Sequence, residues 1–149
     1  MENVPHKIGQ PGLELIKTFE GLRLKKYQDV VGKWTIGYGH LLLPGEHFPE
    51  ELSNDQAEDL LHEDLKCFER DINTIVTVPL NQNQFDALVS LAFNIGIENV
   101  RKSTLLKYLN QGNYTLAATE FSKWDHAGGK EIPGLAHRRK MERDLFVTA

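Results

Sequence analysis

Two carboxylates and a hydroxyl lie close together in the first third of the chain, at Glu20, Asp29 and Thr35. Two carboxyl groups delivered from different backbone elements are what the hydrolysis of a glycosidic bond requires. One protonates the leaving oxygen, and the other activates water or stabilises the developing sugar cation. Spacing alone is a weak indication, because most Asp and Glu side chains are ordinary surface residues and a Thr is usually just a strand former.

The elements around these three residues are predicted to present them differently. An apolar stripe over residues 13–19 predicts a helix that ends at Glu20, where the helix dipole disfavours a carboxylate. From residue 24 to residue 40, β-branched and aromatic residues predict a small antiparallel sheet of two or three strands. We expect Asp29 near the first turn of this sheet and Thr35 on the returning strand.

All of the chain after Ser53 is predicted to be helical. Two capping boxes, Ser53 to Gln56 and Asn81 to Gln84, mark the starts of a long helix and of the helix that follows it. Later helices are predicted to start at Ser103, to cover Ala117 to Trp124, and to cover Leu135 to Phe146. The expected architecture is a single α+β domain over 1–149, with a small lobe (about 12–55), a connecting helix (about 54–75) and a helical lobe (about 76–149).

Composition indicates a globular chain of 149 residues with 40% hydrophobic and 26% charged residues. No apolar run approaches the roughly 18 residues of a membrane span. The first ten residues lack the pattern of a secretory signal, so we expect no export address. The single cysteine, Cys67, excludes an internal disulfide, and we expect it to be a small buried hydrophobe rather than a catalytic thiol.

The charge of the chain is unevenly distributed. Residues 1–100 hold 8 Lys/Arg against 16 Asp/Glu, whereas residues 101–149 hold 9 against 5. The densest basic cluster, residues 137–140, is either a solvated helix face or a surface that attracts a polyanion. Nucleic acid is the weaker candidate, because the overall balance is acidic and no aromatic residues interleave with the cluster. An anionic cell-wall polymer remains open.

The chain resembles the phage-type lysozymes of glycoside hydrolase family 24. The block that carries the resemblance contains Glu20-Gly21, Arg23, Leu24, Tyr27, Asp29, Gly32, Thr35-Ile36-Gly37 and Gly39-His40-Leu41. Similarity continues through residues 78–88, 93–96, 103–110 and 134–142, so it covers nearly the whole chain from Gly12 to Phe146. It implies a lysozyme-like α+β fold.

The resemblance also implies roles for matched residues. Glu20 matches the general acid, Asp29 the second carboxylate, and Thr35 the hydroxyl that helps to hold the attacking water. Leu41, Phe93 and Ser103 match positions that line the saccharide cleft, although core packing explains Leu41 and Phe93 equally well. Arg138 matches an arginine close to the catalytic glutamate, where it would favour the ionised carboxylate and oppose an acid role unless it mainly orients the group.

His40 invites a metal-binding or acid–base interpretation. The histidines of the chain do not share metal-ligand spacing, so we expect no metal and no cofactor. We expect His40 instead to form an ion pair or hydrogen bond that links the sheet to the long helix, with Asp59, Glu63 or Asp64 as its partner.

The function that the resemblance implies is that of an endolysin. Such an enzyme cleaves, with inversion, the β-1,4 bond between N-acetylmuramic acid and N-acetylglucosamine in peptidoglycan. The expected partner is the glycan strand, and we expect a monomer without stable membrane insertion. It would accumulate in the host cytoplasm and reach the wall through a holin-type lesion. The alternatives are a tail-associated lysozyme, a prophage relic, a non-catalytic wall-binding module, and a nucleic-acid binder.

Overall fold

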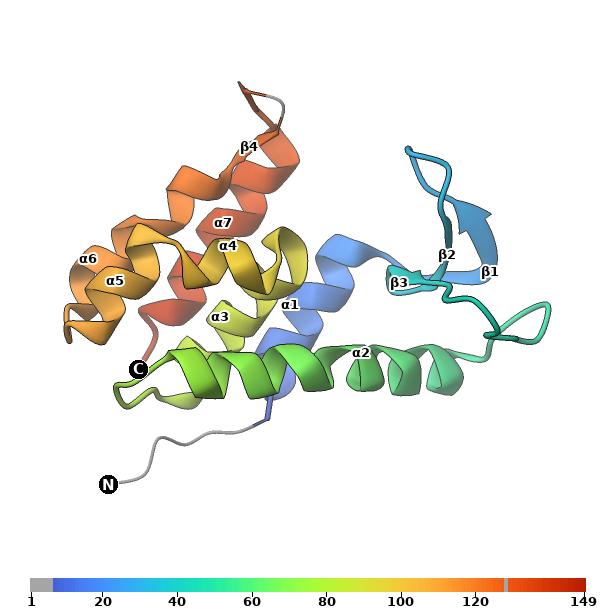
Figure 1. The fold of residues 1–149 in the computed structure, drawn as a ribbon, viewed down its shortest axis with the longest axis horizontal. Coiled ribbons are helices and arrows are strands. Elements are labelled where there is room, and N and C mark those ends of the chain that lie inside the picture. The colour runs from blue at the N-terminus through green and yellow to red at the C-terminus, as the bar shows by residue number, and fades with distance from the viewer. Residues whose placement is uncertain (1–6, 128) are drawn as a thin grey trace. The chain divides into compact units, whose positions relative to one another are not determined.

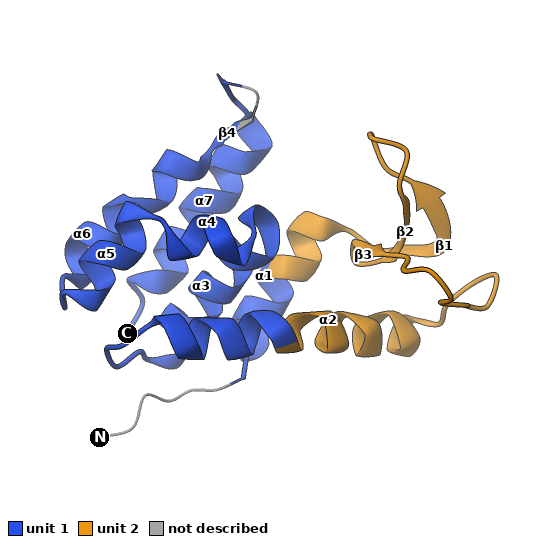
Figure 2. Cartoon of the chain, in the orientation of Figure 1, with its two compact units in different colours: residues 1–15, 67–149 blue, residues 16–66 orange. Residues whose placement is uncertain are grey.

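The computed structural model describes residues 7–127 and 129–149, and Figure 1 shows the order of its elements. The chain divides into two compact units, which are coloured separately in Figure 2. We call residues 16–66 the sheet unit, and residues 1–15 with 67–149 the helical unit. Helices α1 (Gln10–Glu20) and α2 (Asn54–Ile75) each contribute residues to both units.

The sheet unit contains three antiparallel strands in the order β1 (Arg23–Gln28), β2 (Trp34–Gly37) and β3 (His40–Leu41). Thr35 on β2 lies opposite Tyr27 on one side and Leu41 on the other. Because directly opposed residues share a face, Tyr27, Thr35 and Leu41 form a row on one face of the sheet. The pair Ile36–His40 occupies the other face.

The core of the sheet unit lies on the face of Ile36. This residue is buried together with Leu52 and Ala57. Side chains that are partly buried complete the cluster, namely Leu22, Leu24, Tyr38, Leu42, Phe48 and Leu60. A small sheet is stable only when one face packs against another element, and here α2 contributes Ala57 and Leu60 to that packing.

The helical unit is built around α3 (Gln82–Ile95), in which all residues from Phe85 to Ala92 are buried. A helix that is buried on every side belongs to the centre of a bundle. Helix α7 (Pro133–Phe146) packs against α3. The remaining helices are α4 (Ile97–Arg101), α5 (Thr104–Asn110), α6 (Tyr114–Thr119) and a 3-10 turn (Phe121–Trp124).

The predicted helix starts at Ser53, Asn81 and Ser103 are confirmed by their hydrogen bonds. The helices predicted to begin at Ala117 and Leu135 instead begin at Tyr114 and Pro133. At the start of α2, the N–H of Gln56 donates to Ser53 Oγ (3.0 Å) and the N–H of Ser53 donates to Gln56 Oε1 (2.8 Å). Asn81 and Gln84 form the same reciprocal pair before α3, and Ser103 caps α5. Local capping signals therefore predicted the starts of three helices correctly.

The prediction that the chain is helical throughout after Ser53 is wrong near the C-terminus. Strands β4 (His126–Ala127) and β5 (Lys130–Glu131) pair antiparallel between the 3-10 turn and α7. Each strand has two residues, which is too short for an alternating pattern to be visible in the sequence.

The prediction that Cys67 is buried is also wrong, because this residue is exposed. The buried residues of α2 recur at helical spacing along one face, at Ala57, Leu61, Leu65, Ile72 and Ile75. Cys67 lies outside that stripe. In the described part of the chain, none of the helices has the length and apolar composition needed to cross a membrane.

Candidate active site

Glu20 is the last residue of α1, as the sequence predicts. The chain leaves the helix through Gly21, whose φ of 75° favours glycine and whose N–H donates to the carbonyl of Lys17 at 3.0 Å. A Cβ added at Gly39, in the turn between β2 and β3, would lie 3.0 Å from Glu20 Oε1. The carboxylate of Glu20 therefore lies against the backbone of this turn, and glycine at position 39 makes room for it.

Asp29 lies in the turn between β1 and β2, and the backbone fixes its carboxylate. Its Oδ1 accepts hydrogen bonds from the N–H groups of Val31 (3.0 Å) and Lys33 (2.9 Å). Its own carbonyl accepts from the N–H of Gly32 at 2.9 Å. No described residue donates to its Oδ2. The turn thus orients the carboxylate and leaves one oxygen for water or substrate.

Thr35 is coupled to Asp29 through one carbonyl group. Thr35 Oγ1 donates to the carbonyl of Lys33 at 3.1 Å, and the N–H of Asp29 donates to the same oxygen at 2.8 Å. Thr35 is buried. Because its hydroxyl proton points at Lys33, its oxygen lone pairs remain able to accept a hydrogen bond from a water molecule.

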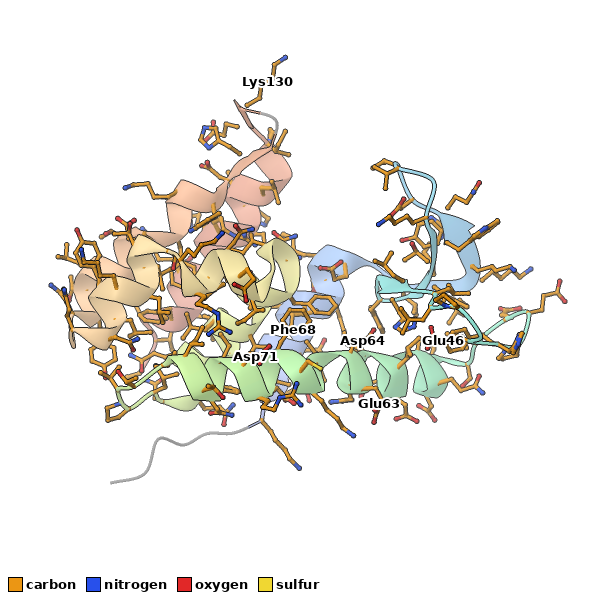
Figure 3. All side chains as sticks on the ribbon, in the orientation of Figure 1. Glu46, Glu63, Asp64, Phe68, Asp71 and Lys130 are labelled. Carbon is orange, nitrogen blue, oxygen red and sulfur yellow. The ribbon has the colours of Figure 1, made fainter. Side chains whose placement is uncertain are left out.

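The predicted link between His40 and α2 is confirmed, with Asp64 as the partner. His40 Nδ1 lies 2.8 Å from each carboxylate oxygen of Asp64, and Nε2 lies 2.9 Å from Glu46 Oε1. Figure 3 labels Asp64 on α2 and Glu46 in the loop after β3. Sequence analysis missed the contact with Glu46. Its only indication in the sequence is that a carboxylate follows His40 by six residues in a loop.

Burial and charge oppose each other at His40. Burial disfavours the charged ring, but hydrogen bonds to Glu46 and Asp64 and the negative charges of these groups outweigh it and raise the pKa of His40 above 6.5. Burial also raises the pKa of Asp64, although His40 acts in the opposite direction. The N–H of Leu43 and the ring of His40 lower the pKa of the more exposed Glu46. A protonated His40 therefore ties β3 to α2 and to the loop after β3.

Two residues that match saccharide-lining positions belong to the helical unit. Phe93 is partly buried, and its ring packs edge-on against Phe68 with centroids 5.4 Å apart. Ser103 is buried, donates to the carbonyl of Val100 at 2.7 Å, and accepts from the N–H of Leu106 at 3.0 Å. Leu41 belongs to the sheet unit and is exposed. That Leu41, Phe93 and Ser103 contact saccharide remains a prediction.

Arg138 belongs to a buried ionic cluster that sequence analysis missed. Its Nε donates to Glu142 Oε2 (3.1 Å) and its Nη2 to the carbonyl of Ser90 (3.1 Å). Ser90 Oγ donates to the same carboxylate at 2.5 Å, and Arg139 Nε lies 2.7 Å from Glu142 Oε1. Arg138 and Arg139 precede Glu142 by four and three residues on one helix, and this spacing could have revealed the cluster in the sequence.

The interpretation of residues 137–140 as a solvated or polyanion-binding surface is wrong for Arg138 and Arg139, which are both buried. Burial raises the pKa of Glu142 and lowers the pKa of Arg139, whereas the attraction between the two groups acts in the opposite direction. An additional role of Arg138 toward Glu20, a residue of the sheet unit, remains a prediction.

Within residues 7–127 and 129–149, no group of three or more His, Cys, Asp or Glu side chains is arranged to hold a metal ion. The sheet unit holds the three residues that the family resemblance matches to catalytic positions, Glu20, Asp29 and Thr35, and their action on a substrate remains a prediction. An acid at a helix end, an oriented carboxylate and a buried hydroxyl are compatible with acid-assisted attack of water on a glycosidic bond.

Comparisons with known proteins point to one family. The family model described as phage lysozyme matches residues 17–142. An endolysin of Acyrthosiphon pisum secondary endosymbiont phage 1 is 47% identical over 95% of this chain and 99% of its own length. An endolysin of Bacillus phage B103 is also 47% identical over 95% of this chain, but the match spans only 54% of that protein.

The chain thus spans about half the length of the Bacillus phage relatives that it matches. Among solved structures, a point mutant of the lysozyme of phage P22 superposes with a TM-score of 0.87, at 41% identity over 95% of this chain and 99% of the other. The predicted lysozyme-like α+β fold is confirmed by this likeness. With a family model that covers most of its residues and relatives well above 30% identity, the chain belongs to the phage lysozyme family.

Proposed function

We propose that the protein is an endolysin that hydrolyses the β-1,4 bond between N-acetylmuramic acid and N-acetylglucosamine in bacterial peptidoglycan. The observation that carries the proposal is the coupling of Asp29 and Thr35 through the carbonyl of Lys33, in the same unit as Glu20 at the end of α1. Membership of the phage lysozyme family supports the substrate class.

In the proposed reaction Glu20 donates a proton to the glycosidic oxygen as the bond breaks. Asp29, whose Oδ1 is already occupied by two N–H groups, uses Oδ2 to accept a proton from the attacking water. The oxygen of Thr35 accepts a second hydrogen bond from the same water. Attack on the ring face opposite the leaving group gives inversion.

The biological setting is part of the proposal. The enzyme acts as a monomer on the glycan strands of the wall and needs neither a metal nor a cofactor for this reaction. It accumulates in the cytoplasm of the host and reaches peptidoglycan after a holin-type lesion opens the membrane. Several relatives bear the name endolysin, which supports a role in host lysis.

Turbidity loss of chloroform-treated Gram-negative cells tests the activity. We expect Glu20→Gln to reduce the rate about 100-fold or more, because a general acid contributes at least that factor. Glu51→Gln, an exposed carboxylate of the same unit, is the matched control and should clear cells like the unmodified chain. Retention of most activity by Glu20→Gln would remove Glu20 as the acid.

Two further measurements separate the alternatives. Proton NMR of the first-formed reducing end should show the anomer opposite to that of the substrate, and a retained configuration would exclude the single-displacement scheme. A non-catalytic wall-binding module would sediment with purified sacculi without releasing soluble fragments, whereas the proposed enzyme releases them.

A further inference from the structure

The turn between β1 and β2 presents two apolar side chains to solvent. Val30 is 104% exposed and Val31 is 72% exposed. Turns favour Gly, Asn, Asp and Ser, which satisfy the local backbone, whereas β-branched residues are typical of strands. Figure 2 shows this turn at the end of the hairpin away from α2, the helix against which the sheet packs. The two valines therefore add little to the packing of the sheet unit and offer their apolar surface to a partner.

Two further exposed apolar side chains lie beside this turn. Trp34 begins β2 and is 47% exposed, and Leu43 lies in the loop after β3 and is 59% exposed. Both line one shallow groove that also includes Gly32 of the turn. Thr35 is the next residue of β2, so Trp34 points to the opposite face of the sheet. Large apolar side chains that gather in one place indicate an interaction surface, and here that surface is separate from the face that holds Thr35.

The hairpin that carries these side chains is basic, although the part of the chain around it is acidic. Residues 23–34 hold four Lys/Arg and one Asp, a net charge of +3, whereas residues 1–100 hold 8 Lys/Arg against 16 Asp/Glu. Lys26 Nζ lies 5.1 Å from the centre of the Trp34 ring, a cation–π distance. Among the described residues, no carboxylate forms an ion pair with a basic side chain of the hairpin. Half of the basic residues of the first hundred positions thus lie in this hairpin without a neutralising partner.

We propose that this hairpin docks reversibly on the surface of a bilayer that contains anionic phospholipids. The two valines enter the boundary between headgroups and acyl chains, and Trp34 lies at the headgroup level. Lys26 and Lys33 contact lipid phosphates. Apolar insertion and cationic attraction are each weak alone, and peripheral binding uses both. A symmetric contact between two copies of the chain would bring two basic hairpins together, so charge favours the lipid surface as the occupant.

Co-sedimentation with large unilamellar vesicles tests the proposal. We expect the unmodified chain to sediment with vesicles of phosphatidylglycerol and phosphatidylethanolamine, but not with vesicles of phosphatidylcholine, which carry no net charge. Val30→Asn should lower the partition coefficient about tenfold, because one exposed valine side chain no longer enters an apolar region. Lys26→Gln should lower it about fivefold at low salt, the contribution of one lysine near an anionic membrane surface. Failure of the unmodified chain to bind the anionic vesicles would overturn the proposal.

Leu116→Asn and Lys107→Gln are the matched controls, because both side chains are exposed and belong to the helical unit. Both variants should bind the anionic vesicles like the unmodified chain. Thermal unfolding should be nearly the same for Val30→Asn and the unmodified chain, since the side chain of Val30 is fully exposed. Equal losses of binding in the controls and in the hairpin variants would overturn the assignment to the hairpin.

Two other occupants of the hairpin would give different results. Binding that depends on Lys26 but not on Val30, and that soluble polyphosphate competes away, would assign the hairpin to a charged polymer and overturn insertion into a bilayer. Self-association that Val30→Asn abolishes, without binding of the unmodified chain to vesicles, would assign the hairpin to a second copy of the chain and also overturn the proposal. The vesicle assay does not measure hydrolysis, so failure of the proposed function and failure of this inference are distinguishable.

Discussion

In the helical unit the carboxylate of Glu142 is fully buried between two guanidinium groups, whereas in the sheet unit the carboxylate of Asp29 is held by backbone N–H groups of an exposed turn. In the first arrangement buried charges of opposite sign are paired with one another. Removal of one partner therefore leaves the others buried without a counter-charge, at a large desolvation cost. The second fixes an orientation while leaving an oxygen accessible. The carboxylate of Glu142 is thus fully engaged within the fold, whereas that of Asp29 keeps one oxygen to which no described residue donates.

The largest effect on stability should come from Glu142→Gln. It leaves Arg138 and Arg139 buried without a counter-charge, which should lower the free energy of unfolding by about 3–5 kcal/mol in urea titrations. Asp144→Asn is the control on the same helix, because its ion pairs with Lys140 and Arg143 are exposed and contribute about 0.5 kcal/mol or less. Similar losses for both variants would show that burial of the cluster does not matter.

The next largest loss should come from Asp86→Ala. The buried carboxylate of Asp86 accepts hydrogen bonds from the N–H groups of Gly9 (2.9 Å) and Gly12 (3.1 Å), and so caps the start of α1 from α3. We expect a loss of about 2–3 kcal/mol, because a cap is removed and buried donors are left without partners. Asn81→Ala removes the exposed cap of α3 and should cost about 1 kcal/mol. Equal losses would contradict the importance of burial.

The sequence predicted features that depend on neighbouring residues and missed contacts between residues that are far apart in the chain. The helix end at Glu20, the turn at Asp29 and the capping box at Ser53 were all predicted, because each depends on residues close in the chain. The contact of Asp86 with Gly12 joins residues 74 apart, and no local pattern reports it. Arg138 and Arg139 looked like surface cations, since composition cannot show that Ser90 and Glu142 surround them. Cys67 is different, because the apolar spacing of α2 already placed it outside the buried stripe.

In the sheet unit, His40 resembles the buried ionic cluster of the helical unit, because it is buried and lies between two carboxylates. The pH dependence of stability tests whether its positive charge contributes to the fold. Since its pKa is raised in the folded state, its contribution to stability is complete below about pH 6.5 and is lost as the pH rises through the raised value. We expect His40→Gln to cost about 2 kcal/mol near pH 5.5 and progressively less toward pH 9. Thermal unfolding across this range measures the difference.

His62→Gln is the control for this prediction, because His62 lies on the same helix as Asp64, is exposed, and is 3.9 Å from Glu58. Its cost should be small, because ion pairs between exposed side chains contribute little to stability. A cost of His40→Gln that stays constant or grows between pH 6 and pH 9 would mean that the ring does not contribute as a cation.

The smallest loss of stability, and the sharpest test of the comparison, should come from Gly39→Ala. A Cβ there would lie 3.0 Å from Glu20 Oε1, and the φ of 81° adds backbone strain of about 1 kcal/mol. Gly45→Ala carries the same strain at φ 86° but has no atom within 4 Å of its added Cβ, so the two variants differ mainly in the contact with Glu20. Both should lose similar stability in urea titrations, while only Gly39→Ala should lose lytic rate, about tenfold, because displacement of an acid by a few tenths of an ångström impairs proton transfer. Equal lytic rates of the two variants would indicate that Glu20 does not take part in the reaction. The carboxylates of the sheet unit would then serve to stabilise the fold, as those of the helical unit do.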